Sequence, residues 1–163
     1  MLFVTVFLAS LIIGSFFGHL VHLIIHQPWS GPAFRGHMSH HLELYPPGDL
    51  VSDRYRTAKW QNSGVFLFTP PFILILGAVG GLLWWLGAPL WVTVTFGMTM
   101  LAFSLANDFI HDASHIRKHP LRRFRWFKRL CVMHYIHHRD MTKNYGIVNF
   151  TYDRIFGTFC THT

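Results

Sequence analysis

The sequence predicts an all-α integral membrane protein with about three transmembrane helices and with interfacial helices that form a histidine-rich cytoplasmic cap. Hydrophobic residues make up 51% of the chain and charged residues only 13%, whereas about 25% of a soluble domain is charged. No Asp, Glu, Lys or Arg precedes Arg35, and none lies between Lys59 and Asp108. Because a spanning helix needs roughly 20 apolar residues, the first gap has room for one crossing and the second for two.

Proline and glycine mark the ends of the three predicted spans. The first runs roughly over residues 2–26 and ends at Gln27-Pro28, the second covers 64–86, and the third covers 90–119 and ends at Pro120. Gly87-Ala88-Pro89 is expected to be a tight turn, which makes the last two spans a hairpin. The first apolar run lacks a basic start and is longer than the core of a signal peptide, so we expect a retained helix. Residues 1–163 are predicted to form one membrane-embedded domain.

The distribution of positive charge predicts the orientation of the spans. Arg35, Arg54, Arg56 and Lys59 follow the first span, and ten Lys or Arg residues follow Ile110, whereas the N-terminus and the hairpin turn carry none. The positive-inside rule therefore predicts cytoplasmic polar segments and an external N-terminus, in a bacterial inner membrane or the endoplasmic reticulum.

Residues 121–138 are predicted to form an interfacial amphipathic helix. Spacings of three and four place Phe127, Leu130, Cys131, His134 and His138 on one stripe. Basic residues crowd the rest of this helix, and the net charge of the chain is +7. Since this cluster interleaves with aromatic residues directly after an apolar span, anionic lipid headgroups are favoured over nucleic acid as its partner.

Twelve of the thirteen histidines fall into four clusters, which are His19, His22 and His26; His37, His40 and His41; His111, His115 and His119; and His134, His137 and His138. Residues three and four apart share a helix face, so each cluster can direct several imidazoles to one place. The predicted topology puts all four clusters on the same side of the membrane. Because neutral imidazole is the commonest metal ligand among side chains, the pattern predicts a metal site.

The sequence leaves the identity of the metal open, because imidazole suits Zn, Cu, Fe and Ni. About ten histidines suffice for two ions, and two neighbouring redox metals can bind and reduce dioxygen. Carboxylates are scarce, and only Asp108 and Asp112 lie beside a cluster. Asp108 shares a stripe with His111 and His115, so we expect it to orient a ligand from behind.

The motifs HLIIH at 22–26, HMSHH at 37–41, HIRKH at 115–119 and HYIHH at 134–138 resemble those of the fatty acid hydroxylase / sterol desaturase superfamily. The tail NYGIVNFTYDRIFGT at 144–158 is similar to the C-terminal signature of that superfamily, so the resemblance covers nearly the whole chain. It implies a membrane fold with a cytoplasmic cap over two metal ions. It also implies ten ligands, namely His22, His26, His37, His40, His41, His115, His119, His134, His137 and His138.

Several further residues receive secondary roles. His111-Asp112 resembles the start of a motif in the related carotenoid hydroxylases, so His111 could replace His119 as a ligand. His19, Asp108, His111 and Asp112 are candidates for an additional ligand or for a position behind one. Asn144, Tyr145 and Asp153 are candidates for contact with substrate, with packing of the cap as the alternative. We expect no catalytic residue beyond the metal centre.

The resemblance implies a hydroxylase that uses O2 and two iron ions, which zinc can replace in purified protein, to attack an unactivated C–H bond of a membrane lipid. Fatty acyl, sphingolipid and sterol-type substrates are expected, with a carotenoid ring as the alternative and desaturation as a related outcome. Electrons would come from a separate reductase with a ferredoxin or a b-type cytochrome. The basic surface at 117–129 could dock an acidic donor or bind headgroups.

Three other classes of protein compete with this interpretation. A membrane metal carrier would place polar groups along a path through the bilayer, but the second and third spans show only scattered Thr and Ser before Asn107. A bis-histidine haem protein would leave most of the histidines unexplained. A hydrolytic zinc enzyme would need only three or four ligands.

Overall fold

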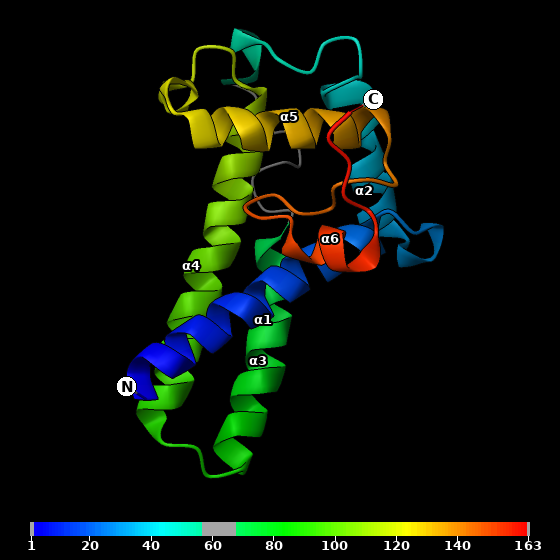
Figure 1. Ribbon diagram of the computed structural model, residues 1–163. Helices are drawn as coiled ribbons and strands as arrows, with labels where there is room; N and C mark the ends of the chain where they lie inside the picture. Colours follow the sequence, from blue (N-terminus) through cyan, green and yellow to red (C-terminus); the bar gives the residue numbers. More distant parts are fainter. Residues whose placement is uncertain (1, 57–67, 163) are drawn as a thin grey trace.

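A computed structural model describes residues 2–56 and 68–162, and these residues form helices and connecting loops with no β-strand among them. The longer helices are α1 (Leu2–Ile25), α2 (Pro32–Ser39), α3 (Thr69–Trp85), α4 (Leu90–His115), α5 (Arg125–Arg139) and α6 (Thr151–Phe156) (Figure 1). Short 3₁₀ turns, η1 (Pro28–Ser30), η3 (Asp53–Arg56) and η5 (Pro120–Arg123), and a π-helical turn, η2 (His40–Leu44), connect them. The predicted all-α class is confirmed over the described residues.

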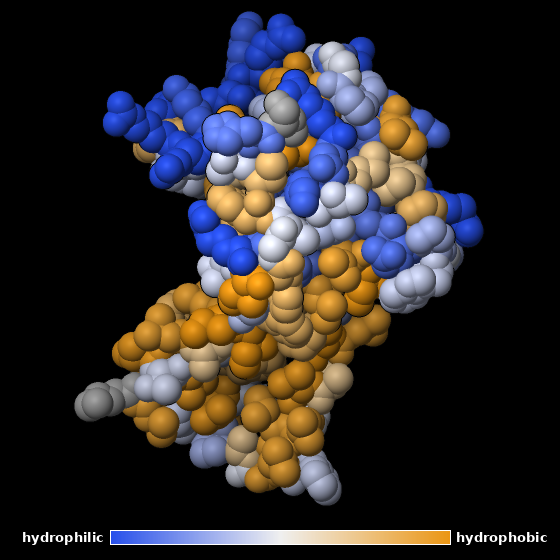
Figure 2. Space-filling view, turned by 45° about the vertical axis from the view of Figure 1, so that its right-hand side comes forward, coloured by the Kyte–Doolittle hydropathy of each residue, from blue (hydrophilic) through white to orange (hydrophobic). Residues whose placement is uncertain are grey.

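Two helices in the described part of the chain are long and apolar enough to cross a membrane. They are α1, with 24 residues, and α4, with 26. Only 28% of the most apolar window of each helix is buried inside the protein, whereas the core helix of a soluble protein would be mostly covered. Figure 2 shows the resulting apolar surface over one half of the molecule, with the polar residues gathered over the other half.

The third predicted span appears as the shorter helix α3, which has 17 residues and is apolar throughout. Its predicted start at residues 64–67 lies outside the described residues. The turn at Gly87-Ala88-Pro89 is confirmed: Gly87 has a φ of 71°, and the Ala88 N–H donates to the Leu83 carbonyl at 2.9 Å. Helices α3 and α4 therefore form the expected hairpin (Figure 1).

Helix α1 crosses α4 obliquely and packs closely on it (Figure 1). Gly14 and Gly18 lie one turn apart on the contact face, and a Cβ atom on Gly14 would lie 3.2 Å from the Met100 sulfur and 3.3 Å from the Phe103 ring. Small residues four apart allow two apolar helices to approach in this way. The close approach sets the position of the C-terminal end of α1, which carries the first histidines.

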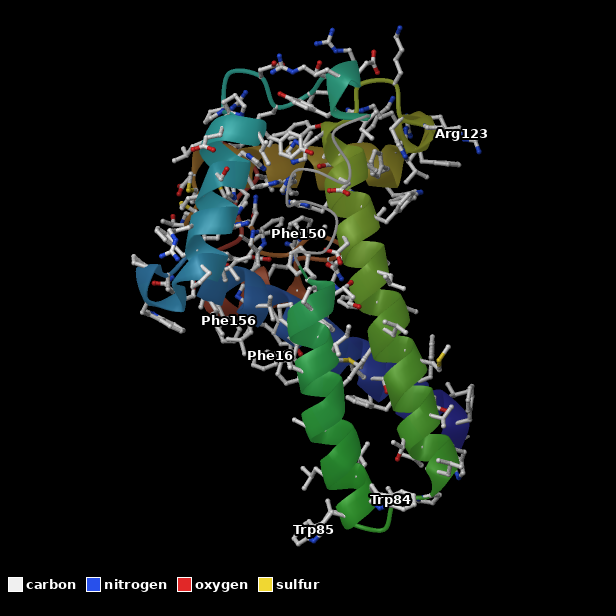
Figure 3. The ribbon with its side chains drawn as sticks, turned by 180° about the vertical axis from the view of Figure 1, so that it is seen from behind. Phe16, Trp84, Trp85, Arg123, Phe150 and Phe156 are labelled. Carbon is white, nitrogen blue, oxygen red and sulfur yellow. The ribbon has the colours of Figure 1, made fainter. Side chains whose placement is uncertain are left out.

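The two ends of the hairpin differ in chemistry. Trp84 and Trp85 are 71% and 80% exposed at the hairpin turn, whereas Arg123 lies at the opposite end beside α5 (Figure 3). Aromatic residues at one boundary and basic residues at the other are typical of a chain that spans a bilayer. Which of the two ends faces the cytoplasm stays a prediction.

Helix α4 ends at His115, four residues before the predicted end of the span at His119. Ile116 has extended dihedral angles, and the Arg122 guanidinium donates to the Ser114 carbonyl at 2.6 Å and to the Ile116 carbonyl at 2.8 Å. A side chain that binds the last carbonyls of a helix stabilises its end. The predicted interfacial helix is likewise divided, into η5 and α5, by the extended residue Phe124.

Asp108 stabilises the start of α3 from within α4. Its carboxylate accepts hydrogen bonds from the Phe68 N–H at 2.9 Å and the Thr69 N–H at 3.1 Å, and it also accepts from the Thr69 hydroxyl. The first N–H groups of a helix have no partner within the helix, and an acidic side chain can satisfy them. The hydrogen bonds of Asp108 therefore connect the two helices of the hairpin.

We predict that Asp108→Ala lowers the free energy of unfolding by about 2 kcal/mol, because it leaves two buried N–H groups without an acceptor. Thermal denaturation of the detergent-solubilised protein measures this change. Asp49→Ala is the control, since Asp49 is half-exposed in a surface ion pair with Arg54 and should change stability by less than about 0.5 kcal/mol. Equal effects of the two substitutions would contradict the capping role.

Candidate metal centre

Ten histidine side chains form two compact groups. The ligand nitrogens within each group all lie within 4.8 Å of one another. The first group consists of His22, His26, His37, His41 and His137, and the second of His40, His111, His115, His134 and His138. Among the described residues, neither group contains a cysteine or a carboxylate.

The local structure of each motif explains how the histidines divide. His22 and His26 are one helical turn apart at the end of α1 and belong to the first group, whereas His111 and His115 are one turn apart at the end of α4 and belong to the second. Side chains four residues apart lie on the same face of a helix. Each apolar helix therefore supplies a pair of imidazoles to one group only.

The two HxxHH motifs each serve both groups. His37 and His41 join the first group and His40 joins the second, whereas His134 and His138 join the second group and His137 joins the first. In the first motif, α2 widens into the π-helical turn η2, where the Tyr45 N–H donates to the His40 carbonyl at 3.0 Å. Such π-helical turns are frequent at functional sites. Each motif thus connects the two groups.

The two groups are in direct contact. The rings of His41, in the first group, and His138, in the second, have centroids 4.1 Å apart. The rings of His40 and His41 have centroids 5.3 Å apart. Ions held in the two groups would therefore be neighbours.

In the first group, one Nε2 atom lies at hydrogen-bond distance from more nitrogens than it can hydrogen-bond to. His37 Nε2 lies 3.1 Å from His22 Nε2, 2.8 Å from His26 Nε2 and 3.1 Å from His41 Nε2. A neutral imidazole nitrogen carries either one N–H or one lone pair, so it cannot form strong hydrogen bonds with three other imidazoles. Lone pairs that surround a shared cation would satisfy all four nitrogens.

The spacing of these nitrogens fits a metal ion. Two imidazole nitrogens that bind one ion at about 2.1 Å and at right angles lie about 3 Å apart. In the second group, His134 Nε2 lies 3.0 Å from His115 Nε2 and 3.1 Å from His138 Nε2. Both groups therefore have the dimensions of a nitrogen coordination sphere.

Backbone carbonyls determine which nitrogen of three imidazoles carries the proton. His22 Nδ1 lies 2.6 Å from the Tyr145 carbonyl, His137 Nδ1 lies 2.7 Å from the Lys143 carbonyl, and His115 Nδ1 lies 2.8 Å from the Leu50 carbonyl. Since a carbonyl can only accept, each Nδ1 must donate. The Nε2 lone pair is then directed into the group, as in most metal-binding histidines.

Burial keeps the imidazoles neutral and available. It lowers the pKa of His26 to about 3 and that of His137 to about 4, and it lowers the pKa values of His37 and His134 well below the ordinary value. Repulsion from neighbouring histidines adds to the effect at His26, His37 and His134. Because metal ions bind the deprotonated imidazole, these side chains need not lose a proton to bind one at neutral pH.

His40 and His111 provide a separate test of the fit to a metal. Their side chains are almost completely buried, and neither ring nitrogen of either residue has a hydrogen-bond partner among the described residues. A buried polar group without a partner costs about 1–3 kcal/mol. Both residues belong to the second group, where a bound cation would satisfy one nitrogen of each ring.

Nine of the ten ligands implied by the resemblance lie in the two groups, and His111 occupies the remaining position. His119 lies outside both groups, where its Nδ1 accepts from the Leu121 N–H at 3.3 Å and its ring contacts Phe109 and Phe127. The spacing of four between His115 and His119 no longer places them on one face, because α4 ends at His115.

Of the four candidates for an additional ligand or a position behind one, His111 lies in the second group, whereas His19, Asp108 and Asp112 lie outside both groups. His19 is buried with its Nδ1 3.5 Å from the Asp153 carboxylate. Asp112 lies 3.8 Å from His111 Nδ1. The Asp108 carboxylate accepts hydrogen bonds from the start of α3 and, among the described residues, from no histidine, so its expected role in orienting a ligand is not confirmed.

The three candidates in the C-terminal tail are buried beside the first group. The Asn144 side-chain amide donates to the Met133 carbonyl at 3.1 Å and to the Cys160 carbonyl at 2.8 Å. The Tyr145 ring contacts the rings of His22, His26 and His137. Asp153 accepts from two backbone N–H groups of the tail.

The sequence did not predict the backbone carbonyls that support the imidazoles from behind. Lys143 and Leu50 were not candidates, and Tyr145 was a candidate only for contact with substrate or packing of the cap. Every residue has a backbone carbonyl, so no residue type signals this role. Tyr45 was also missed, although its ring stacks on His115 at a centroid distance of 3.8 Å and an interplanar angle of 9°. Tyr45 lies four residues after His41, which in an α-helix would place both side chains on one face. The π-helical turn changes this periodicity, so the spacing does not predict the contact with His115.

The protein-family model described as fatty acid hydroxylase matches residues 7–158 of the 163-residue chain. The searches of curated proteins and of solved structures returned no match.

We predict that His111→Ala lowers the metal content of the purified protein by about half, whereas His119→Ala leaves it unchanged. The first substitution removes a nitrogen from the second group, and the second removes one that lies outside both groups. Metal analysis of the two variants, expressed and purified in parallel in iron-rich medium, makes the comparison. Retention of all metal by His111→Ala, with loss from His119→Ala, would contradict the geometry.

Proposed function

Because the chain belongs to the fatty acid hydroxylase family, we propose that it is a membrane-bound hydroxylase of lipids. The proposed enzyme uses O2 and two iron ions to oxidise an unactivated C–H bond. The family is one of hydroxylases and desaturases, which are oxidoreductases, and the resemblance predicted from the histidine motifs is confirmed. The buried histidine groups and the apolar helices agree with metal binding and with a place in the membrane.

The observation that carries the proposal is the pairing of two all-histidine groups in direct contact. A single group would fit a structural or hydrolytic zinc ion, which commonly uses three or four ligands. Two adjacent groups of five imidazoles hold more ligands than that chemistry needs. Bound iron would supply the capacity to activate dioxygen, and the all-nitrogen donor set suits iron among other metals.

The residues around the groups have three tasks in this proposal. Phe68 and Phe72, both completely buried, help to exclude water from the region between the helices and the histidines. The carbonyls behind His22, His137 and His115 hold these imidazoles in the tautomer that binds metal. The five histidines of each group are already packed together without an ion, so binding an ion costs less conformational entropy.

An apolar substrate fits the position of the groups. Each group takes two histidines from the end of an apolar helix, the first group from α1 and the second from α4, and the apolar surface of the molecule borders its polar half (Figure 2). We propose that a lipid chain approaches the groups from the bilayer along these helices. A fatty acyl, sphingolipid or sterol-type substrate is proposed, with a carotenoid ring as the alternative within the same superfamily. Hydroxylation inserts one oxygen atom into a C–H bond, and removal of a second hydrogen would give a desaturated product.

The second oxygen atom leaves as water, so each turnover consumes two electrons and two protons from an external donor. We propose a reductase acting through a ferredoxin or a b-type cytochrome. The exposed residues Arg123, Arg125, Lys128 and Arg129 form no ion pair with any described residue, and they offer a positive surface for an acidic donor.

Replacing these four residues with Gln should raise the KM for an acidic protein donor about tenfold or more while leaving the rate with a small chemical reductant unchanged. Loss of complementary charge slows encounter with the donor but does not alter the metal groups. Reductase-coupled turnover measured at several salt concentrations tests this, because the difference should shrink as salt rises. An unchanged KM, with weaker binding to anionic vesicles, would show that the surface binds lipid headgroups instead.

A membrane metal-binding or transport protein is the alternative from another class. Such a protein would release its ions on the opposite side of the membrane. The two histidine groups instead lie together at one end of the apolar helices and are nearly all completely buried. Uptake of radioactive iron into proteoliposomes would favour the transporter.

We predict that purified, iron-loaded protein supplied with lipid extract, a reductase system and ¹⁸O2 gives a lipid product that carries one labelled oxygen atom. Mass spectrometry detects the label and also identifies the substrate class. The matched control is His137→Ala, which should lose at least a hundredfold in rate because the first group lacks one of its nitrogens. An alcohol product without label, or label arising from H2¹⁸O, would rule out the oxygenase.

A further inference from the structure

The C-terminal tail contacts the first histidine group through two consecutive stretches of backbone. The Tyr145 carbonyl accepts from His22 Nδ1, and the Lys143 carbonyl accepts from His137 Nδ1. Both imidazoles are completely buried members of the first group. In the second group, His115 Nδ1 donates to the Leu50 carbonyl, which lies in a different loop. The tail therefore serves one group and not the other.

The orientation of the Tyr145 carbonyl follows from the planarity of the peptide bond. In a trans peptide unit, the carbonyl of one residue and the N–H of the next point in opposite directions. The Gly146 N–H donates to Asp153 Oδ2 at 2.8 Å, so the Tyr145 carbonyl of the same unit points away from Asp153. It lies 2.6 Å from His22 Nδ1. The carboxylate thus directs the carbonyl that determines the tautomer of His22.

The Lys143 carbonyl is held in the same way. The Asn144 N–H, in the peptide unit of that carbonyl, donates to the Thr158 carbonyl at 3.0 Å, and the Lys143 carbonyl lies 2.7 Å from His137 Nδ1. Thr158 is in turn connected to Asp153, because its hydroxyl donates to Asp153 Oδ1 at 2.7 Å. Both peptide units are therefore anchored on one carboxylate.

Asp153 has the properties of a fixed anchor. Its side chain is completely buried, and its two oxygens accept from the consecutive N–H groups of Tyr145 and Gly146 at 2.7 and 2.8 Å. Burial alone would raise the pKa of Asp153, but the nearby His19 imidazole and the hydrogen bonds from Thr158 and Gly146 outweigh burial and hold the pKa below its usual value. A Cβ atom on Gly146 would lie 2.8 Å from Asp153 Oδ2, so the tail fits tightly around the carboxylate.

We propose that Asp153 is a positioning residue for the first metal ion alone, acting through the Tyr145 and Lys143 carbonyls on the tautomers of His22 and His137. The inference rests on the metal centre of the proposed function, and it adds a residue that supports the binding of one ion and not of the other. The second ion depends instead on His115, which is held by the Leu50 carbonyl and stacks on Tyr45. The tail is thus a support for one half of a paired site.

The test uses Asp153→Asn in the purified full-length chain, stripped of metal and titrated with Co²⁺, whose visible absorption reports nitrogen coordination. Asn keeps one acceptor oxygen and replaces the other with an NH2 group, which cannot accept a hydrogen bond. When this NH2 group faces the Gly146 N–H, the hydrogen bond from Gly146 is lost. We expect one of two Co²⁺ binding steps to weaken about 10- to 100-fold, as for other residues that support a ligand. The other step should stay unchanged.

Three companion variants make the result specific. Asp49→Asn is the matched control, since Asp49 lies in a surface ion pair, and it should bind both ions as the wild type does. Thr158→Val, which removes only the hydroxyl contact to Asp153, should weaken the same step by a smaller factor. His111→Ala identifies the second group, because it should remove the step that Asp153→Asn leaves intact.

The positioning role of Asp153 and the proposed oxygenase activity fail on different results. Two unchanged steps in Asp153→Asn, or equal weakening of both steps, overturn the positioning role. If that variant does not fold, as judged by thermal denaturation of the metal-free protein, an unshifted step in Thr158→Val overturns it instead. Wild-type protein that binds two Co²⁺ ions in separable steps, with the expected shift in Asp153→Asn but no labelled lipid from ¹⁸O2, overturns only the oxygenase.

Discussion

Ten imidazole nitrogens, nearly all fully withdrawn from solvent, converge on two adjoining volumes in this protein. Each nitrogen can satisfy one hydrogen bond at most, yet His37 Nε2 alone lies within 3.1 Å of three others. Buried polar atoms that exceed their possible partners are expensive. A cation bound in each group would offset this unfavourable free energy by coordinating the nitrogens. The rest of the fold holds the imidazoles in the positions that such coordination needs.

The remaining structure supplies that arrangement from both ends of the chain. Close packing of α1 on α4 at Gly14 and Gly18 sets the relation between the two helical histidine pairs. The HxxHH motifs then connect the two groups, because each contributes to both. Backbone carbonyls from two loops fix the tautomers. Substitution in one element is therefore expected to affect distant ligands through their shared geometry.

The membrane explains why such a small chain can hold this site. Much of its apolar surface faces outward on α1, α3 and α4, where lipid can cover it, so the interior is left largely to polar and aromatic side chains. The hydrophobic core includes Phe68, Phe72 and Phe127, all of which are completely buried, and the Phe68 ring contacts the rings of His22 and His111. An apolar wall of this kind strengthens electrostatic interactions inside the site, because it excludes water.

The sequence by itself determined the helical class, the apolar helices, the hairpin turn and the gathering of histidines at one end, because period, composition and proline or glycine positions act over short distances along the chain. Only the tertiary structure decided that α4 ends at His115, since the Arg122 guanidinium that binds its last carbonyls comes from seven residues later. That end places His111 in the second group and His119 outside it. The division of each HxxHH between two groups, and the carbonyls that hold His22, His115 and His137, depend on contacts between segments far apart in sequence, for which residue type carries no signal.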